Sequence, residues 1–165
     1  LDLGSQGVCV PHVDTRDQAQ AVADAAKFAP LGKRGIATSR QGYGVPDFFE
    51  AANAESLAII LIEDIVAVEN LDEILEVEGV DLFYVAPGDL GQSLGHLDRT
   101  HPEVLATVER AITAIVAAGR PAGTLVTTES VSHYTDLGVR FVTTGYTPWL
   151  ERGVKDFLMA MGPGR

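Results

Sequence analysis

The sequence is poor in cysteine and in long apolar runs. Cys9 is its single cysteine, which excludes an internal disulfide, and its place in the apolar segment from Gly7 to Val10 predicts a buried, inert thiol in a reducing compartment. No stretch approaches the roughly 20 apolar residues of a membrane-spanning helix, and no charged-then-apolar leader precedes the first strand. We therefore expect a cytoplasmic protein with no membrane partner.

Positive charge is also scarce. Lys and Arg total 12 against 23 Asp and Glu, which gives a formal net charge of −11. Such a chain repels the phosphate backbone of nucleic acids, so we expect no nucleic-acid partner. Low-complexity tracts are absent as well, and the 46% hydrophobic content over 165 residues is sufficient for a sizeable core. Residues 1–165 are therefore expected to form a single domain.

Short runs of β-branched and apolar residues alternate with helical patterns along the chain. The predicted strands are Gly7 to Val13, Leu57 to Glu63, Leu82 to Ala86, Gly123 to Thr127 and Phe141 to Thr144. The predicted helices run from Thr15 to about Pro30, from Asn70 to Gly79, from Pro102 to Gly119, from Val131 to Gly138 and from Thr147 through Leu158. The result is five βα units.

The predicted strands favour a parallel sheet. Ala58 to Ile62 are apolar at consecutive positions, as a strand covered on both faces requires. Alternating strands and helices restrict the fold to a barrel or a doubly wound sheet. A closed (β/α)₈ TIM barrel takes about 250 residues, so five units fit this chain and eight do not. The pattern leaves a partial barrel and an open sheet both open.

Two stretches depart from this rhythm. Residues 36–46 form a long irregular connection, which suits a cover over an active site as well as a mobile loop, and a short helix is predicted from Asp47 to Asn53. The chain opens on Leu1-Asp2-Leu3-Gly4, a pattern typical of a helix end with its glycine cap. We therefore expect that further sequence precedes Leu1 in the natural protein.

Acidic residues follow two consecutive predicted strands. Glu63 follows the strand from Leu57, and Asp89 follows the strand from Leu82. Adjacent parallel strands lie about 4.8 Å apart, so carboxylates at their carboxyl ends can converge. Two carboxylates sharing a site repel each other unless one is protonated or a cation lies between them. Oxygen ligands with open positions suit Mg²⁺ or Mn²⁺. The alternative is that Glu63 caps the next segment and Asp89 forms a turn, both solvated.

The segments around these acids carry a resemblance to a known family. Two features carry this resemblance. The segments around Glu63 and Asp89 occur together, with the two acids 26 residues apart, and the similarity extends along essentially the whole chain. The segments are Leu61-Ile62-Glu63-Asp64, Val68-Glu69-Asn70-Leu71-Asp72-Glu73-Ile74, Val77-Glu78-Gly79-Val80-Asp81 and Ala86-Pro87-Gly88-Asp89-Leu90. The chain resembles the HpcH/HpaI family of class II pyruvate aldolases.

The resemblance implies a chemistry for these positions. Glu63 and Asp89 match the family's two metal-binding carboxylates, and the backbone amides around Ala86, Gly88 and Asp89 match those that help to hold the pyruvyl carboxylate. The implied fold is a TIM barrel, of which this chain is the C-terminal five βα units. The implied reaction is the metal-dependent cleavage or formation of 4-hydroxy-2-oxo acids from pyruvate and an aldehyde, with the cation as Lewis acid.

The chain departs from the family pattern at two positions. Leu61 stands where the family usually has glutamine, which removes a polar group from the expected substrate pocket, and Ala86 stands where glycine is frequent. The family's catalytic histidine and pyruvate-binding arginine lie on strands upstream of Leu1, so the catalytic residues stay unassigned.

The histidines and Arg34 offer no replacement for them. His12 ends the first predicted strand, and we interpret it as a packing or hydrogen-bonding residue rather than as a base. His96, His101 and His133 fall in predicted loops or helices, where solvated roles are expected. Arg34 is interpreted as structural.

Two further readings stay open. An acyl-CoA lyase of the citrate-lyase-beta or malyl-CoA type is the nearest enzymatic alternative, although it needs a basic surface for CoA phosphates. A non-catalytic metal-binding fragment is the alternative outside enzymes. The last helix is unusually apolar, with Trp149, Phe157 and Leu158, and the family resemblance implies that such a helix packs against a neighbouring subunit, so we expect a homo-oligomer.

Overall fold

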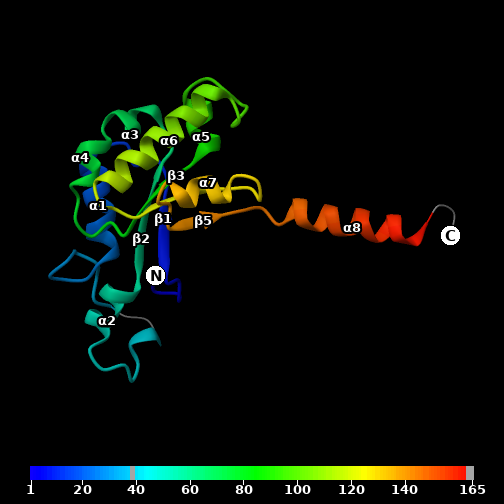
Figure 1. Cartoon of the computed structure of the whole chain (residues 1–165). Coiled ribbons are helices and arrows are strands. Elements are labelled where there is room, and N and C mark those ends of the chain that lie inside the picture. The colour runs from blue at the N-terminus through cyan, green and yellow to red at the C-terminus, as the bar shows by residue number, and fades with distance from the viewer. Residues whose placement is uncertain (38–39, 163–165) are drawn as a thin grey trace.

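The computed structural model describes residues 1–37 and 40–162, and a parallel sheet lies at its centre (Figure 1). Its strands, in chain order, are β1 (Gly7–Val10), β2 (Leu57–Ile62), β3 (Leu82–Val85), β4 (Ala122–Leu125) and β5 (Phe141–Thr143). Over the described residues each strand pairs in parallel with the next one in sequence, in the order β1-β2-β3-β4-β5. A doubly wound sheet reverses its strand order, whereas this one does not. The fold is therefore a curled half-barrel, as a partial TIM barrel requires.

Helices follow the strands. They are α1 (Arg16–Ala26), α2 (Phe48–Glu55), α3 (Ile65–Glu69), α4 (Leu71–Leu75), α5 (Pro87–Ser93), α6 (Pro102–Ala117), α7 (Val131–Asp136) and α8 (Thr147–Met161), with a 3₁₀ turn at Arg40–Gly42. In Figure 1, α1, α3, α4 and α6 gather on one side of the sheet, and α6 packs against β3 and β4. No helix among the described residues is both long and apolar enough to cross a bilayer.

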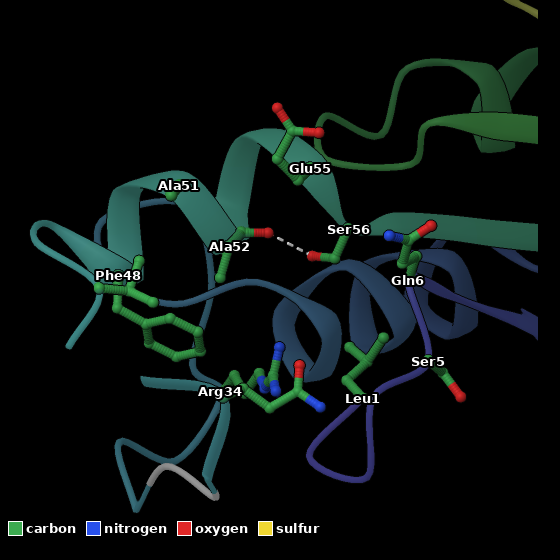
Figure 2. A pocket seen from close by; sticks show the side chains of 11 residues that line it. Leu1, Ser5, Gln6, Arg34, Phe48, Ala51, Ala52, Glu55 and Ser56 are labelled. Carbon is green, nitrogen blue, oxygen red and sulfur yellow. Dashed lines mark hydrogen bonds between the residues drawn. The ribbon is translucent and has the colours of Figure 1, made fainter. Parts of the chain in front are cut away.

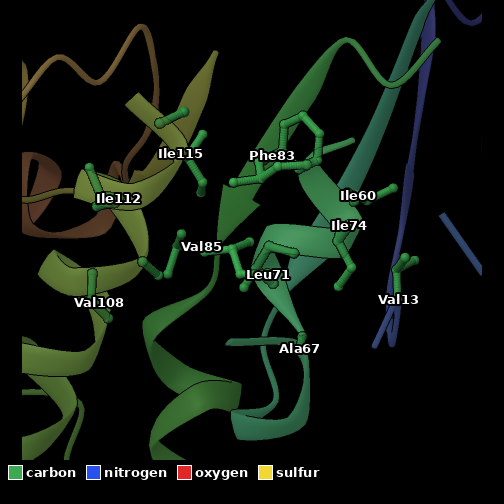
Figure 3. Packing of buried hydrophobic residues seen from close by; sticks show 14 of the residues in the cluster. Val13, Ile60, Ala67, Leu71, Ile74, Phe83, Val85, Val108, Ile112 and Ile115 are labelled. Carbon is green, nitrogen blue, oxygen red and sulfur yellow. The ribbon is translucent and has the colours of Figure 1, made fainter. Parts of the chain in front are cut away.

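The hydrophobic core fills the space between the sheet and these helices. Ile60 and Ile62 of β2 and Phe83 and Val85 of β3 are fully buried there. Figure 3 shows the side chains of Val108 and Ile112 from α6 and of Leu71 and Ile74 from α4 in the same cluster. Successive strand residues point to opposite faces, so the intervening positions line the other, concave side of the sheet.

Cys9 lies on that concave side, and the prediction that it is buried is wrong. In β1, Val8 and Val10 face the helices and are half-buried, whereas Cys9 is exposed because it points away from them. An apolar run alone does not reveal which face of a strand is covered. Partial burial is the main cause that raises the pKa of the Cys9 thiol, and the nearby Glu63 raises it further, which favours the neutral thiol.

The structure departs from the sequence prediction most clearly at the end of β1 and in the helices α3, α4 and α5. β1 ends at Val10 because Pro11 has no N–H for the ladder and His12 takes a φ of 52°. The helix expected from Asn70 is α4, and a separate turn, α3, precedes it with Asp64 as its N-cap. Helix α5 was not predicted. Positions 38 and 39 of the irregular connection lie outside the described residues.

The last helix stands apart from the body. Figure 1 shows α8 projecting away from the sheet, and each of its residues is exposed. Its apolar side chains follow a helical stripe formed by Leu150, Val154, Phe157, Leu158 and Met161.

Candidate active site

The carboxyl ends of β2 and β3 lie side by side. Ile62, the last residue of β2, pairs with Val85, the last residue of β3, and the Ala86 N–H donates to the Ile62 carbonyl at 3.1 Å. Glu63 and Ala86 therefore begin the two segments that leave the sheet at the same edge. In parallel barrels this edge carries the catalytic groups.

Glu63 is a buried carboxylate held from the neighbouring strand. Its residue is only 5% exposed, and its Oε1 atom accepts a hydrogen bond from the His12 backbone N–H at 2.8 Å. The left-handed backbone of His12 accompanies this contact. The His12 ring is 76% exposed, with Nδ1 3.8 Å from the same oxygen, so the backbone of His12 makes the closer contact and the ring stays at the rim. A buried carboxylate at the carboxyl end of a strand suits a cation ligand, because a buried charge is costly unless it is paired or binds a metal.

Asp89 lies in the first turn of α5, one strand farther along the same edge. Ala86 is the N-cap of this helix, Pro87 is its first residue, and Asp89 is exposed. Gly88 is also exposed, and an added Cβ there would meet no atom within 4 Å, so a ligand can approach its backbone. The first N–H groups of a helix lack intrahelical partners, which leaves those of Gly88 and Asp89 available, whereas that of Ala86 is used by the sheet.

Asp64, not Glu63, caps the helix that follows β2. Its Oδ1 atom accepts from the Val66 N–H at 2.9 Å and caps α3. Glu63 is therefore not the cap of α3, so its carboxylate is not used in capping. The solvated alternative for Glu63 is contradicted by its burial.

Sequence reasoning missed one cluster near this edge. Ligand atoms of His96, His101 and Glu103 lie within 4.8 Å of one another, in the connection from α5 to α6. The available signal is the spacing of two histidines and a glutamate within eight residues, because each histidine alone predicts only a solvated role. Arg34, in contrast, has the structural role expected, because its guanidinium lies 4.4 Å from the centre of the Phe28 ring and pairs with Asp2.

A cavity of about 230 Å³ lies at the opposite end of the sheet. Figure 2 shows it between the start of the chain and α2, with Gln6 just before β1 and Ser56 just before β2. The amino-terminal ends of barrel strands serve stability rather than chemistry. This cavity is therefore not the candidate active site.

A protein-family model described as HpcH/HpaI aldolase/citrate lyase matches residues 1–150. The chain belongs to this family. The resemblance inferred from the motifs around Glu63 and Asp89 is thus confirmed for the family as a whole.

Named relatives of this HpcH/HpaI chain are aldolases. A hydroxypyruvate/pyruvate aldolase of Cupriavidus necator is 39% identical, covering 88% of this chain and 56% of its own length. A 2-keto-3-deoxy-L-rhamnonate aldolase of Salmonella paratyphi B is 40% identical, covering 98% of this chain and 62% of its own length. The chain thus spans less than two thirds of the length of these relatives.

A solved structure has the same fold. It is an HpcH/HpaI aldolase/citrate lyase family protein from Burkholderia cenocepacia, which is 29% identical with a TM-score of 0.86 and covers 97% of this chain and 66% of its own.

Proposed function

We propose that this chain supplies the metal-binding part of a divalent-metal-dependent pyruvate aldolase, with Glu63 and Asp89 as the protein ligands. The observation that carries the proposal is Glu63, a buried carboxylate at the end of β2, beside the turn that leads to Asp89. The names of the 39% and 40% identical relatives support aldol chemistry on 2-oxo acids.

The donor set fits Mg²⁺ or Mn²⁺. Both side chains offer carboxylate oxygens, which these hard cations prefer, and few enough of them to leave positions for water and substrate. A cation held there would supply Lewis-acid stabilisation of negative charge on a bound 2-oxo acid. The His12 N–H fixes one oxygen of Glu63, which orients that ligand before any cation arrives.

The chain's own backbone would hold the substrate carboxylate. The Gly88 and Asp89 N–H groups point out of the first turn of α5, and the open space at Gly88 admits an anionic group. Leu61, half-buried on the concave side, and Ala86 would shape the adjoining pocket in place of the glutamine and glycine frequent in the family.

Manganese binding tests the ligand assignment. We expect Glu63→Gln and Asp89→Asn each to weaken Mn²⁺ binding by at least about tenfold, measured by electron paramagnetic resonance of free Mn²⁺. Asp64→Asn is the matched control, because asparagine also caps helices and Asp64 adjoins Glu63. Equal Mn²⁺ affinity in wild type, Glu63→Gln and Asp89→Asn would contradict the assignment.

An acyl-CoA lyase is the alternative reaction. The net charge of −11 disfavours it, because CoA carries phosphates that need basic contacts. A retro-aldol assay of the protein with a 4-hydroxy-2-oxo acid and with malyl-CoA would separate the two, and turnover of malyl-CoA alone would overturn our preference.

We also propose that α8 packs against a second copy of the chain. No other part of the chain that the structure describes covers the apolar stripe of α8, and Phe157 is 67% exposed. Contiguous apolar surface on a protein commonly marks a contact with another protein.

A further inference from the structure

The cluster of His96, His101 and Glu103 is built from side chains that already touch. His96 Nε2 lies 2.8 Å from Glu103 Oε2, and the two imidazole rings stack with their centres 3.6 Å apart and their planes 15° apart. His96 is only partly exposed, with 28% of its side chain accessible. Two imidazoles and a carboxylate thus meet at one point of the surface.

The backbone of both histidines is fixed by local hydrogen bonds. The His96 N–H donates to the Gly91 carbonyl at 2.7 Å, and the His101 N–H donates to the Asp98 carbonyl at 3.0 Å. Asp98 Oδ1 also accepts from the Thr100 N–H at 2.8 Å, which closes the turn between the histidines. The backbone positions of both histidines are therefore fixed before a ligand binds, so ion binding would rearrange side chains only.

One of the existing contacts would give way to a metal ion at little cost. His96 Nε2 and Glu103 Oε2 lie at hydrogen-bond distance, 2.8 Å, whereas an ion bound between them needs a separation of roughly 3.3 Å, given metal–ligand distances of about 2.1 Å. His101 Nδ1 accepts from the Glu103 N–H at 3.3 Å, a long capping bond. His101 can therefore turn toward the ion, through Nδ1 directly or through Nε2 once its ring proton moves to Nδ1.

We propose that His96, His101 and Glu103 form a second metal site, for a borderline divalent ion such as Zn²⁺, Co²⁺ or Ni²⁺. Imidazole nitrogens bind these ions and not Mg²⁺ or Ca²⁺, so the site differs in chemistry from the carboxylate pair of Glu63 and Asp89. Three protein ligands leave a coordination position for water. This proposal does not depend on the proposed aldolase function.

The site would fix a loop at the active-site edge. Its first ligand follows α5, and the other two lie at the start of α6. Between the histidines, Arg99 lines a cavity of about 320 Å³ at the ends of β4 and β5, together with Thr127 and Arg152. An ion bound here would therefore tie the loop that carries Arg99 to the first turn of α6.

Zinc and cobalt titrations of the chelator-treated chain test the proposal. For wild type we expect one Zn²⁺ bound per chain in calorimetry and visible absorption bands from bound Co²⁺. His96→Gln, Glu103→Gln and His101→Asn should each weaken Zn²⁺ binding at least about 100-fold, since loss of a ligand exceeds the 10- to 100-fold cost of losing its supporting contacts. Asparagine at position 101 keeps an N-cap for α6, so this variant should fold normally.

The matched control is His133→Gln. His133 Nε2 lies 2.8 Å from Glu109 Oε1, a similar exposed pair that no third ligand joins among residues 1–37 and 40–162, and its loss should leave Zn²⁺ affinity unchanged. Zinc binding that persists in His96→Gln and His101→Asn, or that is lost only in Glu63→Gln, would overturn the proposal. Absence of Zn²⁺ binding to the wild type would overturn it as well.

Discussion

Buried Lys27 and partly exposed Asp81 form an ion pair at the amino-terminal end of β2, opposite Glu63. Lys27 Nζ lies 2.8 Å from Asp81 Oδ2, and the same oxygen accepts the Ala58 N–H at 2.7 Å. Lys27 is 3% exposed and also donates to the Asn53 carbonyl at 3.0 Å. Its hydrogen bonds are used within the fold, so Lys27 stabilises the barrel end rather than serving as a Schiff-base lysine.

Replacing Lys27 tests that role. We expect Lys27→Met to lower the free energy of unfolding by about 2–4 kcal/mol, because it leaves the partly buried Asp81 carboxylate without its partner. Urea unfolding followed by circular dichroism measures the change. The control is Lys33→Met, in an exposed pair with Asp24, which should leave stability nearly unchanged. Equal losses in both variants would contradict the account.

Tyr84, on the concave side of the sheet, should make the free energy of unfolding depend on pH. Burial raises the pKa of its phenol, against the opposing effect of its hydrogen bond with Thr143. A raised folded-state pKa stabilises the protein fully below the ordinary tyrosine pKa of about 10, and this stabilisation is lost as pH rises through the folded value.

Tyr84→Phe should therefore flatten the alkaline loss of stability. At neutral pH the variant should be less stable by about 1 kcal/mol, since it lacks the hydrogen bond to Thr143. Above about pH 10 its stability should fall less steeply than that of wild type, because the ionising group is gone. Urea unfolding at a series of pH values provides the test, with Tyr43→Phe at an exposed position as control. A slope unchanged from wild type would refute the assignment.

At the scale of elements, the sequence predicts best where a cap and a periodic stripe coincide. Thr15 and Gln18 form the expected capping box of α1, and α6 begins at Pro102 as expected. Helix α5 escaped prediction because its seven residues contain two glycines, which are poor helix formers, and only the tertiary position after β3 shapes it. The orientation of Cys9 escaped for a similar reason, since covering helices decide which strand face is buried.

The exposed stripe of α8 makes its own prediction. We expect the chain to sediment as a dimer or larger assembly at micromolar concentration, and Phe157→Glu together with Leu158→Glu to shift it to monomer, because charges in an apolar interface are left without partners. Lys155→Glu, on the same helix, serves as the control and should keep the assembly. A wild-type chain that sediments only as a monomer would contradict the proposed packing.

At the scale of the whole molecule, the parallel order of the strands brings the segments that carry Glu63 and Asp89 to the same edge of the sheet. The βα rhythm predicted five units, and the structure adds the strand order that selects a curled half-barrel over a doubly wound sheet. The sequence also placed Glu63 and Asp89 on adjacent strand ends. It could not predict that the His12 backbone would hold Glu63, because that contact spans 51 residues and depends on the left-handed turn at His12.

The most direct test of the central claim is calorimetric titration of Mn²⁺ into the chelator-treated chain with and without pyruvate. We predict that pyruvate tightens Mn²⁺ binding at least about fivefold, because a ligand that contacts both the cation and the Gly88 and Asp89 N–H groups couples the two binding events. The coupling should vanish in Glu63→Gln. Mn²⁺ affinity that is identical with and without pyruvate in the wild type would contradict a pyruvate aldolase site at Glu63 and Asp89.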